Sequence, residues 1–555
     1  MLLILAVVGA ILVAAIADRH GREPALVIVV VGIAASFTPG FPGLDIDSEV
    51  LLSVVLPPLL YSAALGFSFP TFLRNIRPIL GLGVGLVVVT AFAVAAVASW
   101  LVAPLSFGIA LVLGAVVAPP DAVTAVAVGR KLGLPKRVMA ILTGESLVND
   151  AAALTLFSIA VAHVAGTRAF IADPVLLFGY SAVIGPVVGA ALGYATLWIR
   201  KRLDNPGLET VQGLLVPFTA FICAEHLHAS GVLAVVVAGF VVGHGTLSAG
   251  YQTRLQERYV WSSVDVLLEA FVFAYIGLHM RFVLEDVHQA HDSLVQVGIA
   301  ALIVLAVVLL IRPAWVFMMF GRGVLFRHVE RTLSVPTSPR ARSALGAWRR
   351  RSAALGKPWL CWRENAVVSW TGMRGVVTLA AASGIPLTTS TGEPFPERAT
   401  IQAIAFVVSV GTLLLQGATL PSLIRRLKLS DEADAAYDRA ETEKAEQVVR
   451  WAAEEVLARF DAADPTTGLD AAARAEIRQV IARHSQDADE MPDPAEHSLR
   501  GEVFAALYRD VLARQRAALI AERDSGRIDD EIVRAMLDRL DLQEAGITAR
   551  LESRI

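Results

Sequence analysis

Long apolar runs separated by short polar loops fill the first three-quarters of the chain. A run of about 20 apolar residues is long enough for one helix to cross a bilayer. Two of the runs are less clear than the others. The run near 231–243 is short, and the run near 263–280 contains Asp265 and Glu269. The pattern predicts an all-α polytopic membrane protein with thirteen spans, near residues 1–17, 24–38, 49–68, 76–102, 107–128, 137–164, 174–199, 209–227, 231–243, 263–280, 294–320, 364–384 and 400–424.

Basic residues between these runs predict the orientation, because Arg and Lys gather in cytoplasmic loops. If the N-terminus is outside, every second loop is basic, and the long arginine-rich loop near 321–363 is also inside. The outer loops hold little beyond Arg168, Arg281 and Arg398. The inner loops contain Arg19, Arg22, Arg74, Arg77, Arg130, Lys131, Lys136, Arg137, Arg200, Lys201, Arg202, Arg254 and Arg258.

The first apolar run has a second interpretation as a cleaved signal peptide, because "AAIA" resembles a cleavage site. It lacks the basic segment that normally precedes the apolar part of a signal peptide. Cleavage would also fall next to Arg19 and Arg22, which the alternation places inside. The sequence therefore favours a membrane span.

Charged residues are concentrated in the last part of the chain. The 555 residues are 55% hydrophobic and only 18% charged, with a mean hydropathy of +0.60. We therefore predict a membrane domain over 1–428 and a cytoplasmic helical domain over 429–555, which regulates transport or strengthens a dimer; a passive solubilising segment is the alternative. The chain has no nucleotide-binding or metal-ligand spacing, and its two cysteines, Cys223 and Cys361, imply no disulfide framework. We expect no cofactor and no nucleic acid partner.

Two of the predicted spans contain helix-breaking residues and a charged residue at their centres. In "LVLGAVVAPPDAVTAVAVG" these are Pro119, Pro120 and Asp121, and in "NAVVSWTGMRGVVTLAAASG" they are Gly372, Arg374 and Gly375. Interrupted helices at matching places in two halves of a chain indicate the midplane site of a transporter. The two spans lie seven apart, which fits an inverted repeat of spans 1–6 and 8–13. Proline kinks with an arginine that reaches the membrane surface are the simpler alternative.

The sixth span carries four polar residues in "GESLVND": Glu145, Ser146, Asn149 and Asp150. Residues four apart share one helix face, so these side chains form one polar wedge. Hydrogen bonding between helices would explain Ser146 and Asn149. It does not explain Asp150, because a carboxylate at this depth requires either a proton or a cation. A site that holds one or the other is what an exchanger needs.

Arg374 is the expected partner of Glu145, because an unpaired arginine at the bilayer midplane is costly. We expect Arg374 to face the carbonyl end of a half-helix and Asp121 to face an N-terminal end, where the helix dipole is positive. Asp150 is then the carboxylate with no permanent countercharge. We expect it to carry the transported ion.

With these residues in place, the chain resembles the sodium/proton exchanger superfamily, and within it the monovalent cation:proton antiporter-1 family of NhaP-type and animal exchangers. The similarity covers roughly residues 1–428. It rests on "LPPLLYSAAL", "APPDAVTAVAV", "GESLVND", "WTGMRGVVTLAAA" and "LLLQGATLPSLIRRL", which occur in this order.

The resemblance implies thirteen spans, a homodimer in the plasma (inner) membrane, and cation/proton exchange by alternating access for pH and cation homeostasis. It places the family's Asn-Asp pair on Asn149 and Asp150, its glutamate–arginine bridge on Glu145 and Arg374, and a ligand serine on Ser146. A single aspartate at this position implies electroneutral one-for-one exchange.

Two residues depart from the family pattern. Pro120 stands where many relatives have threonine, and Ser62 stands where many bacterial relatives have an acidic residue. The expected cation is therefore Na⁺ or Li⁺, with K⁺ as an alternative. Two other functional classes remain open: a passive cation channel, and an intramembrane aspartyl protease built on Asp121 and Asp150. The missing Gly-x-Gly sequence argues against the protease, so we expect a transporter and not an enzyme.

Overall fold

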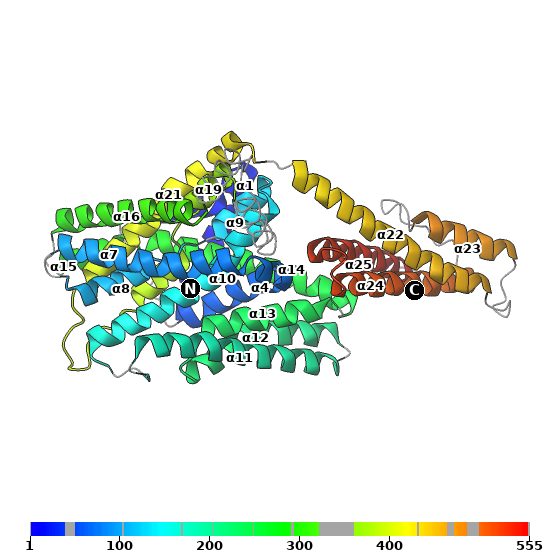
Figure 1. The fold of residues 1–555 in the computed structure, drawn as a ribbon, viewed down its shortest axis with the longest axis horizontal. Coiled ribbons are helices and arrows are strands. Elements are labelled where there is room, and N and C mark those ends of the chain that lie inside the picture. Colours follow the sequence, from blue (N-terminus) through cyan, green and yellow to red (C-terminus); the bar gives the residue numbers. More distant parts are fainter. Residues whose placement is uncertain are drawn as a thin grey trace, which may run out of the picture. The chain divides into compact units, whose positions relative to one another are not determined.

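The structure is a computed structural model of the chain. It describes residues 2–38, 50–102, 105–121, 123–167, 170–171, 173–203, 205–247, 249–289, 293–320, 360–429, 432–462, 471–484 and 499–552. Most of the arginine-rich loop near 321–363 lies outside these ranges. Within them the chain is helical, and the single β-bridge joins Thr388 to Pro394 (Figure 1). The prediction of an all-α protein is confirmed.

The chain divides into two compact units. The first contains Met1–Trp198, Leu214–Val242 and Trp261–Ser430. Its helices, some of which extend into the second unit, are α1 (Leu2–Arg19), α2 (Pro24–Ser36), η1 (Leu51–Val55), α4 (Leu56–Gly66), α5 (Phe69–Arg74), α6 (Ile76–Leu80), η2 (Gly81–Leu86), α7 (Val87–Leu101), α8 (Phe107–Val117), α9 (Val123–Lys131), α10 (Lys136–Ala165), α11 (Pro174–Arg200), α12 (Pro206–His226), α13 (Gly231–Thr246), α14 (Tyr251–Leu278), α15 (Met280–Gln289), α16 (Leu294–Phe320), α19 (Trp362–Trp370), α20 (Val376–Ser383) and α21 (Arg398–Leu427).

Seven helical stretches in the described residues are long and apolar enough to cross a membrane. They are Ile76–Leu101, Lys136–Ala165, Pro174–Arg200, Pro206–His226, Tyr251–Gln289, Leu294–Phe320 and Arg398–Leu427. Four shorter apolar helices are Pro24–Ser36, Leu51–Gly66, Phe107–Val117 and Gly231–Thr246. A multi-pass protein is therefore clear, while the count of thirteen spans and the inverted repeat stay predictions.

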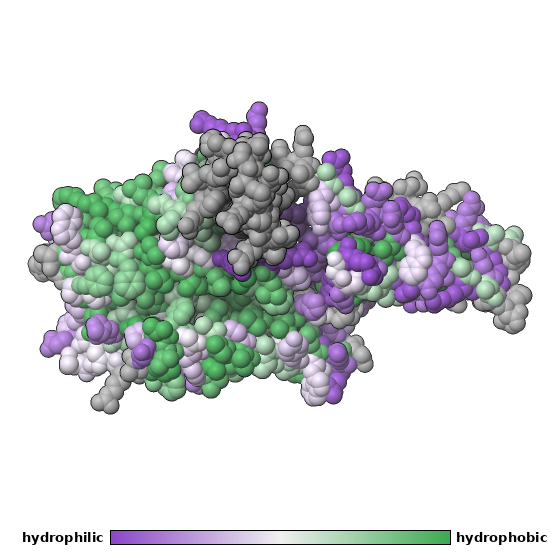
Figure 2. Space-filling view, viewed as in Figure 1, coloured by the Kyte–Doolittle hydropathy of each residue, from purple (hydrophilic) through white to green (hydrophobic). Residues whose placement is uncertain are grey.

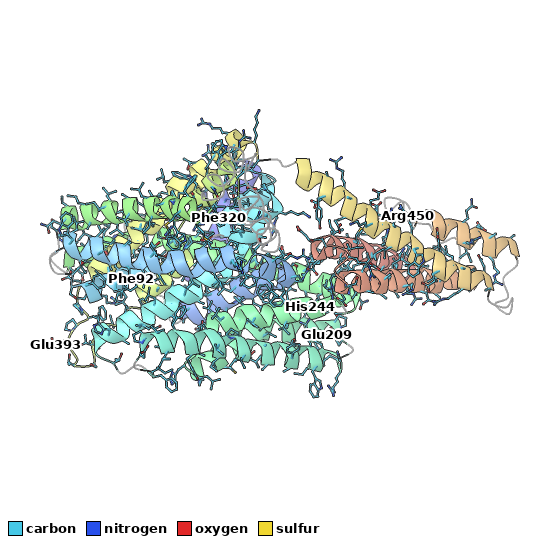
Figure 3. All side chains as sticks on the ribbon, viewed as in Figure 1. Phe92, Glu209, His244, Phe320, Glu393 and Arg450 are labelled. Carbon is cyan, nitrogen blue, oxygen red and sulfur yellow. The ribbon has the colours of Figure 1, made fainter. Side chains whose placement is uncertain are left out.

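Helices of the first unit differ in how much apolar surface they expose. α21 is mostly buried, whereas α11 leaves Val187 and Trp198 exposed, and Phe92 projects outward from α7 (Figure 3). Apolar residues accordingly cover much of the visible surface of this unit (Figure 2). In water such a surface would be unfavourable, but in a bilayer lipid chains cover it. In the interior, helices approach closely, and Gly114 on α8 lies directly against the backbone of Ala91 on α7.

The second unit contains Ile199–Gly213, Gly243–Val260 and Asp431–Ile555. Its long helices are α22 (Glu432–Ala462), α23 (Ala471–His484), α24 (Leu499–Asp524) and α25 (Asp530–Glu552). Their apolar faces form one core, which includes Val449, Val511 and Leu537 and also Leu247 from the loop between α13 and α14. Polar side chains cover the outer faces of these helices (Figure 2).

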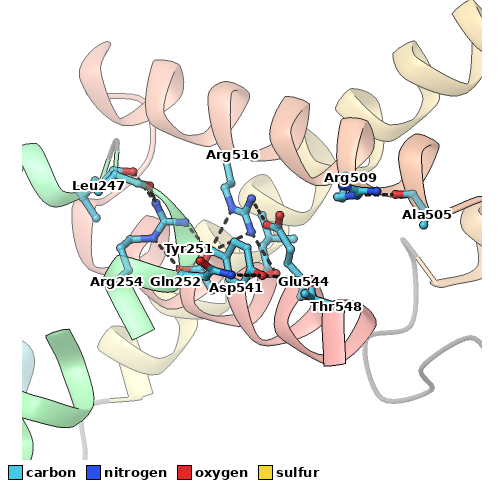
Figure 4. A network of polar contacts seen from close by, with 12 residues as sticks. Leu247, Tyr251, Gln252, Arg254, Ala505, Arg509, Arg516, Asp541, Glu544 and Thr548 are labelled. Atoms are coloured by element: carbon cyan, nitrogen blue, oxygen red, sulfur yellow. Dashed lines mark hydrogen bonds and ion pairs between the residues drawn. The ribbon is translucent and has the colours of Figure 1, made fainter. Parts of the chain in front are cut away.

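A buried charge network joins α25 to the first turns of α14 within this second unit (Figure 4). Asp541, which is 1% exposed, accepts hydrogen bonds from Arg254 Nε at 2.6 Å and from Arg516 Nε at 3.1 Å. Arg516 also pairs with Glu544 at 2.5 Å. Two arginines therefore balance two carboxylates, and no member of the network is left as an uncompensated charge.

Candidate ion-binding site

The first interrupted span consists of α8 and α9. α8 ends at Val117 and α9 begins at Val123, with Pro119 and Pro120 in the non-helical stretch between them. Proline has no backbone N–H, so the stretch contains fewer donors that need a partner. The carbonyl of Pro120 accepts a hydrogen bond from Asn149 Nδ2 at 2.5 Å. The helix is interrupted at the residues that the sequence indicated.

The second interrupted span consists of α19 and α20, with residues 371–375 non-helical between them. Arg374 reaches from this stretch to the C-terminal end of α8. Its Nε donates to the carbonyl of Val117 at 3.0 Å, and its Nη2 donates to that of Ala118 at 3.2 Å. A cation is favourable there, because the last carbonyls of a helix have no intrahelical partner. The expected orientation of Arg374 is confirmed.

The two interruptions touch each other. The backbone N–H of Asp121 donates to the carbonyl of Met373 at 2.6 Å. The Asp121 carboxylate lies so close to Gly375 that a Cβ there would overlap with it. Gly375 is the N-cap of α20, so Asp121 faces a helix N-terminus, as expected. At Gly372 a Cβ would lie 2.7 Å from Cδ of Arg312, so this glycine also makes room for a side chain.

The polar residues of the sixth span lie on α10. Glu145 and Asn149 are buried, Asp150 is 7% exposed, and Ser146 is half-buried. Asp121 is close enough to act electrostatically on Asp150. Among the residues that the structure describes, none pairs with the Asp150 carboxylate through an ion pair or a hydrogen bond. This carboxylate therefore has a like-charged neighbour and no countercharge from the described part of the chain.

Glu145 has a different partner from the one predicted. Both of its carboxylate oxygens accept hydrogen bonds from Arg312 on α16, at 2.5 and 2.8 Å, and both residues are at most 2% exposed. The predicted ion pair between Glu145 and Arg374 is wrong. The physical reason is that the free carbonyls of α8 and the Gly372 carbonyl already occupy the Arg374 guanidinium. Arg312, in contrast, presents two parallel donors to a carboxylate.

A further carboxylate lies near the Ser62 position. Ser62 Oγ donates to Asp265 Oδ1 on α14 at 2.6 Å. Asp265 and Glu269, one turn apart on α14, interact with each other electrostatically, and Glu269 also interacts with Asp121. An acidic side chain therefore reaches Ser62 from another helix, α14. The sequence indicated Asp265 and Glu269 only as irregularities of an apolar run.

The buried charges of these residues differ in whether the protein itself compensates them. The Glu145–Arg312 pair and the contacts of Arg374 are internally compensated. Asp150 is not, so a proton or a small cation is needed to neutralise it. Within the described residues no group of three or more His, Cys, Asp or Glu side chains could hold a resident metal ion.

An all-helical bundle with two interrupted helices and an uncompensated buried carboxylate defines the class of secondary ion transporters, not enzymes. The family model for the transmembrane sodium/hydrogen exchanger matches residues 2–426. The chain belongs to this sodium/hydrogen exchanger family.

Its relatives include a protein of Mycobacterium tuberculosis (strain H37Rv) named as an uncharacterized Na(+)/H(+) exchanger, Rv2287. This relative is 31% identical over 551 residues, which cover 98% of this chain and 95% of the relative. The chain is also similar to a protein of Escherichia coli K12 named as an uncharacterized Na(+)/H(+) exchanger, YjcE, with 28% identity over 521 residues and 90% of each chain covered.

The fold is similar to that of the sodium proton antiporter MjNhaP1 from Methanocaldococcus jannaschii. The TM-score is 0.55 at 19% identity, and the match covers 77% of this chain and 98% of that structure. This similarity concerns the fold.

Proposed function

We propose that the protein is a secondary active antiporter that exchanges Na⁺ or Li⁺ for H⁺ by alternating access. The observation that carries the proposal is the buried Asp150 carboxylate, which has no countercharge among the described residues and lies within the electrostatic reach of Asp121 at the first interruption. The names of the relatives support Na⁺ as a substrate. A K⁺/H⁺ exchanger is the less favoured alternative, because the relatives reported above are named for Na⁺.

In this mechanism Asp150 holds either a proton or a cation. Loss of the proton exposes a carboxylate that attracts the cation, and release of the cation on the other side allows the proton to return. Each form of the site is neutral, since one positive charge balances one carboxylate. Exchange is therefore one-for-one and electroneutral.

Asn149 and Ser146 are the proposed further ligands. Asn149 Nδ2 holds the Pro120 carbonyl, while its Oδ1 is buried and has no hydrogen-bond partner in the described part of the chain. An amide oxygen in that state suits an alkali cation, which prefers oxygen ligands. Ser146 lies one turn before Asp150 on the same helix. Glu145 takes no part in transport, because Arg312 already neutralises it.

The proposed setting is a multi-pass homodimer surrounded by lipid in the plasma (inner) membrane. The N-terminus lies outside, and the domain over 429–555 lies in the cytoplasm, where it regulates exchange or strengthens the dimer. The physiological role is pH and cation homeostasis.

Asp150→Asn tests the proposed function. The amide keeps the shape of the side chain but cannot take up a proton or neutralise a cation. In proteoliposomes with a pH-sensitive dye, we expect exchange of Na⁺, Li⁺ and K⁺ to be lost together, while the size-exclusion profile remains that of the wild type. Asp150→Glu should retain part of the exchange with altered affinity, because the charge is kept.

Asp173→Asn is the matched control. Asp173 caps the first turn of α11 through Oδ1, which Asn can replace, and it lies outside the site. The Asp173→Asn variant should exchange cations at the wild-type rate. Well-folded Asp150→Asn protein with wild-type exchange would refute the proposal, and cation flux without proton flux would indicate a channel.

A further inference from the structure

The non-helical residues 371–375 raise a question of backbone hydrogen bonding. They are buried in the membrane-spanning unit, where neither lipid nor bulk water pairs with their N–H and C=O groups. Each of these groups therefore needs a partner within the protein. The partners of this stretch identify which side chains hold it in place.

Three groups of the stretch have partners outside α21. The Thr371 N–H donates to the carbonyl of Val367 at 3.0 Å, as in the last turn of α19. The Gly372 carbonyl accepts from Arg374 Nη1, and the Met373 carbonyl accepts from Asp121. Within the described residues, no backbone group pairs with the backbone N–H or carbonyl of Arg374.

Two hydroxyl groups on α21 pair with the main chain of Arg374. The Arg374 N–H donates to Thr412 Oγ1 at 3.0 Å, and Ser409 Oγ donates to the Arg374 carbonyl at 3.1 Å. Thr412 Oγ1 in turn donates its proton to the carbonyl of Ser409 at 3.0 Å. All three residues are buried. Because the Thr412 proton is used in this way, its oxygen is oriented to accept from Arg374.

We propose that Ser409 and Thr412 are positioning residues of the ion site. One helix thereby fixes both the N–H and the carbonyl of Arg374, and so the direction from which its side chain approaches α8. The neighbouring Met373 carbonyl holds Asp121, which acts on Asp150. Neither hydroxyl touches the ion, and both act through the main chain of the second interruption. The inference rests on the exchange proposed above.

The first interruption is held in an equivalent way. There the side chain of Asn149 on α10 pairs with the Pro120 carbonyl. α10 follows α9 in the chain as α21 follows α20. In both halves of the predicted repeat, the helix that follows the interruption supplies a buried polar side chain to its backbone.

Thr412→Val tests this role, because valine keeps the shape and removes only the hydroxyl. We expect the KM for Na⁺ of the full-length protein in proteoliposomes to rise about three- to tenfold, the change that loss of one neutral hydrogen bond produces. The maximal rate should change less than the KM. Thr412→Ser should restore the wild-type KM, since it restores the hydroxyl. Ser409→Ala should raise the KM in the same direction and serves if Thr412→Val does not fold.

Thr419→Val is the matched control. Thr419 lies on the same helix and accepts a hydrogen bond from the Trp370 side chain at 2.8 Å, and its other hydrogen bonds go to carbonyls of α21 itself. We expect its KM to be that of the wild type. Equal increases in Thr412→Val and Thr419→Val would show a general packing effect and overturn the inference, as would an unchanged KM in Thr412→Val and Ser409→Ala.

A second readout does not depend on exchange. Na⁺ should raise the Tm of the detergent-solubilised wild type, because a ligand stabilises the state that it binds. The Na⁺ concentration at half the maximal shift should be higher in Thr412→Val. If wild-type vesicles show no exchange, the proposed function fails, whereas identical Na⁺ midpoints in the two proteins overturn the inference about Thr412 in either case.

Discussion

Removal of Arg312 should destabilise the protein mainly by leaving Glu145 as a buried charge. Arg312→Met keeps an apolar side chain of similar length but removes both hydrogen bonds to the carboxylate. At 1% exposure, the Glu145 carboxylate is not solvated by water once its partner is removed. The loss of one partner of a buried ion pair costs about 3–5 kcal/mol. We therefore expect a low yield of folded protein and a clearly lowered Tm.

Adding Glu145→Gln should recover part of this loss, because the orphan charge disappears. Recovery is incomplete, since Arg312 also donates to the Val368 carbonyl at 2.8 Å. The double variant should therefore be more stable than the sum of the two single changes predicts, by an interaction energy of about 1–3 kcal/mol. Arg374→Met with Glu145→Gln is the comparison, and its interaction energy should be smaller.

The assay is thermal unfolding of purified protein in detergent, with the unfolded fraction measured by fluorescence-detected size exclusion. Wild type, the three single variants and the two double variants complete both cycles. An interaction energy between Glu145 and Arg374 as large as that between Glu145 and Arg312 would refute the assignment. Strict additivity for Arg312 and Glu145 would refute it as well.

Three further changes test other parts of the structure. Gly375→Ala should place a methyl group against the Asp121 carboxylate; we expect strain of about 1–3 kcal/mol and a loss of vesicle exchange, and wild-type exchange would contradict the contact. Asp541→Asn should leave Arg254 without its buried partner and lower stability by about 3–5 kcal/mol in thermal unfolding, whereas an unchanged Tm would argue against the network. Truncation after Leu429 should still give an inserted protein that exchanges cations with altered pH dependence or dimer stability, and complete loss of exchange would show that the tail is part of the transport machinery.

The membrane character of the fold and the two interruptions could be predicted because both depend on local chemistry. In lipid a spanning segment must satisfy its own backbone groups, so a long apolar run leaves few alternatives to a helix. Pro119 and Pro120 limit helix formation wherever they occur. The position of Arg374 followed from the same reasoning, because carbonyl ends attract a cation.

The partner of Glu145 could not be predicted in this way. Arg312 and Arg374 both lie well inside apolar spans, and the choice between them depends on how α10, α16 and α8 pack. Arg312 stands eight residues before the end of its predicted span, 294–320, and its neighbours in the sequence do not indicate which carboxylate it pairs with. Ser409 and Thr412 gave no signal either, since hydroxyl side chains in helices commonly bond to their own backbone. Only tertiary structure shows that they also reach Arg374.

The hydrogen bond between the Asp121 N–H and the Met373 carbonyl joins main chain to main chain. Alanine scanning cannot detect this hydrogen bond, because every substitution except proline at Asp121 retains the N–H and the carbonyl that form it. A substitution at Met373 changes only its buried side chain and leaves in place the carbonyl that links the two interruptions. Replacing the Asp121 amide with an ester would remove the donor and leave both side chains unchanged. A change in the backbone, and not a side-chain replacement, is therefore needed to remove the hydrogen bond between the two interruptions.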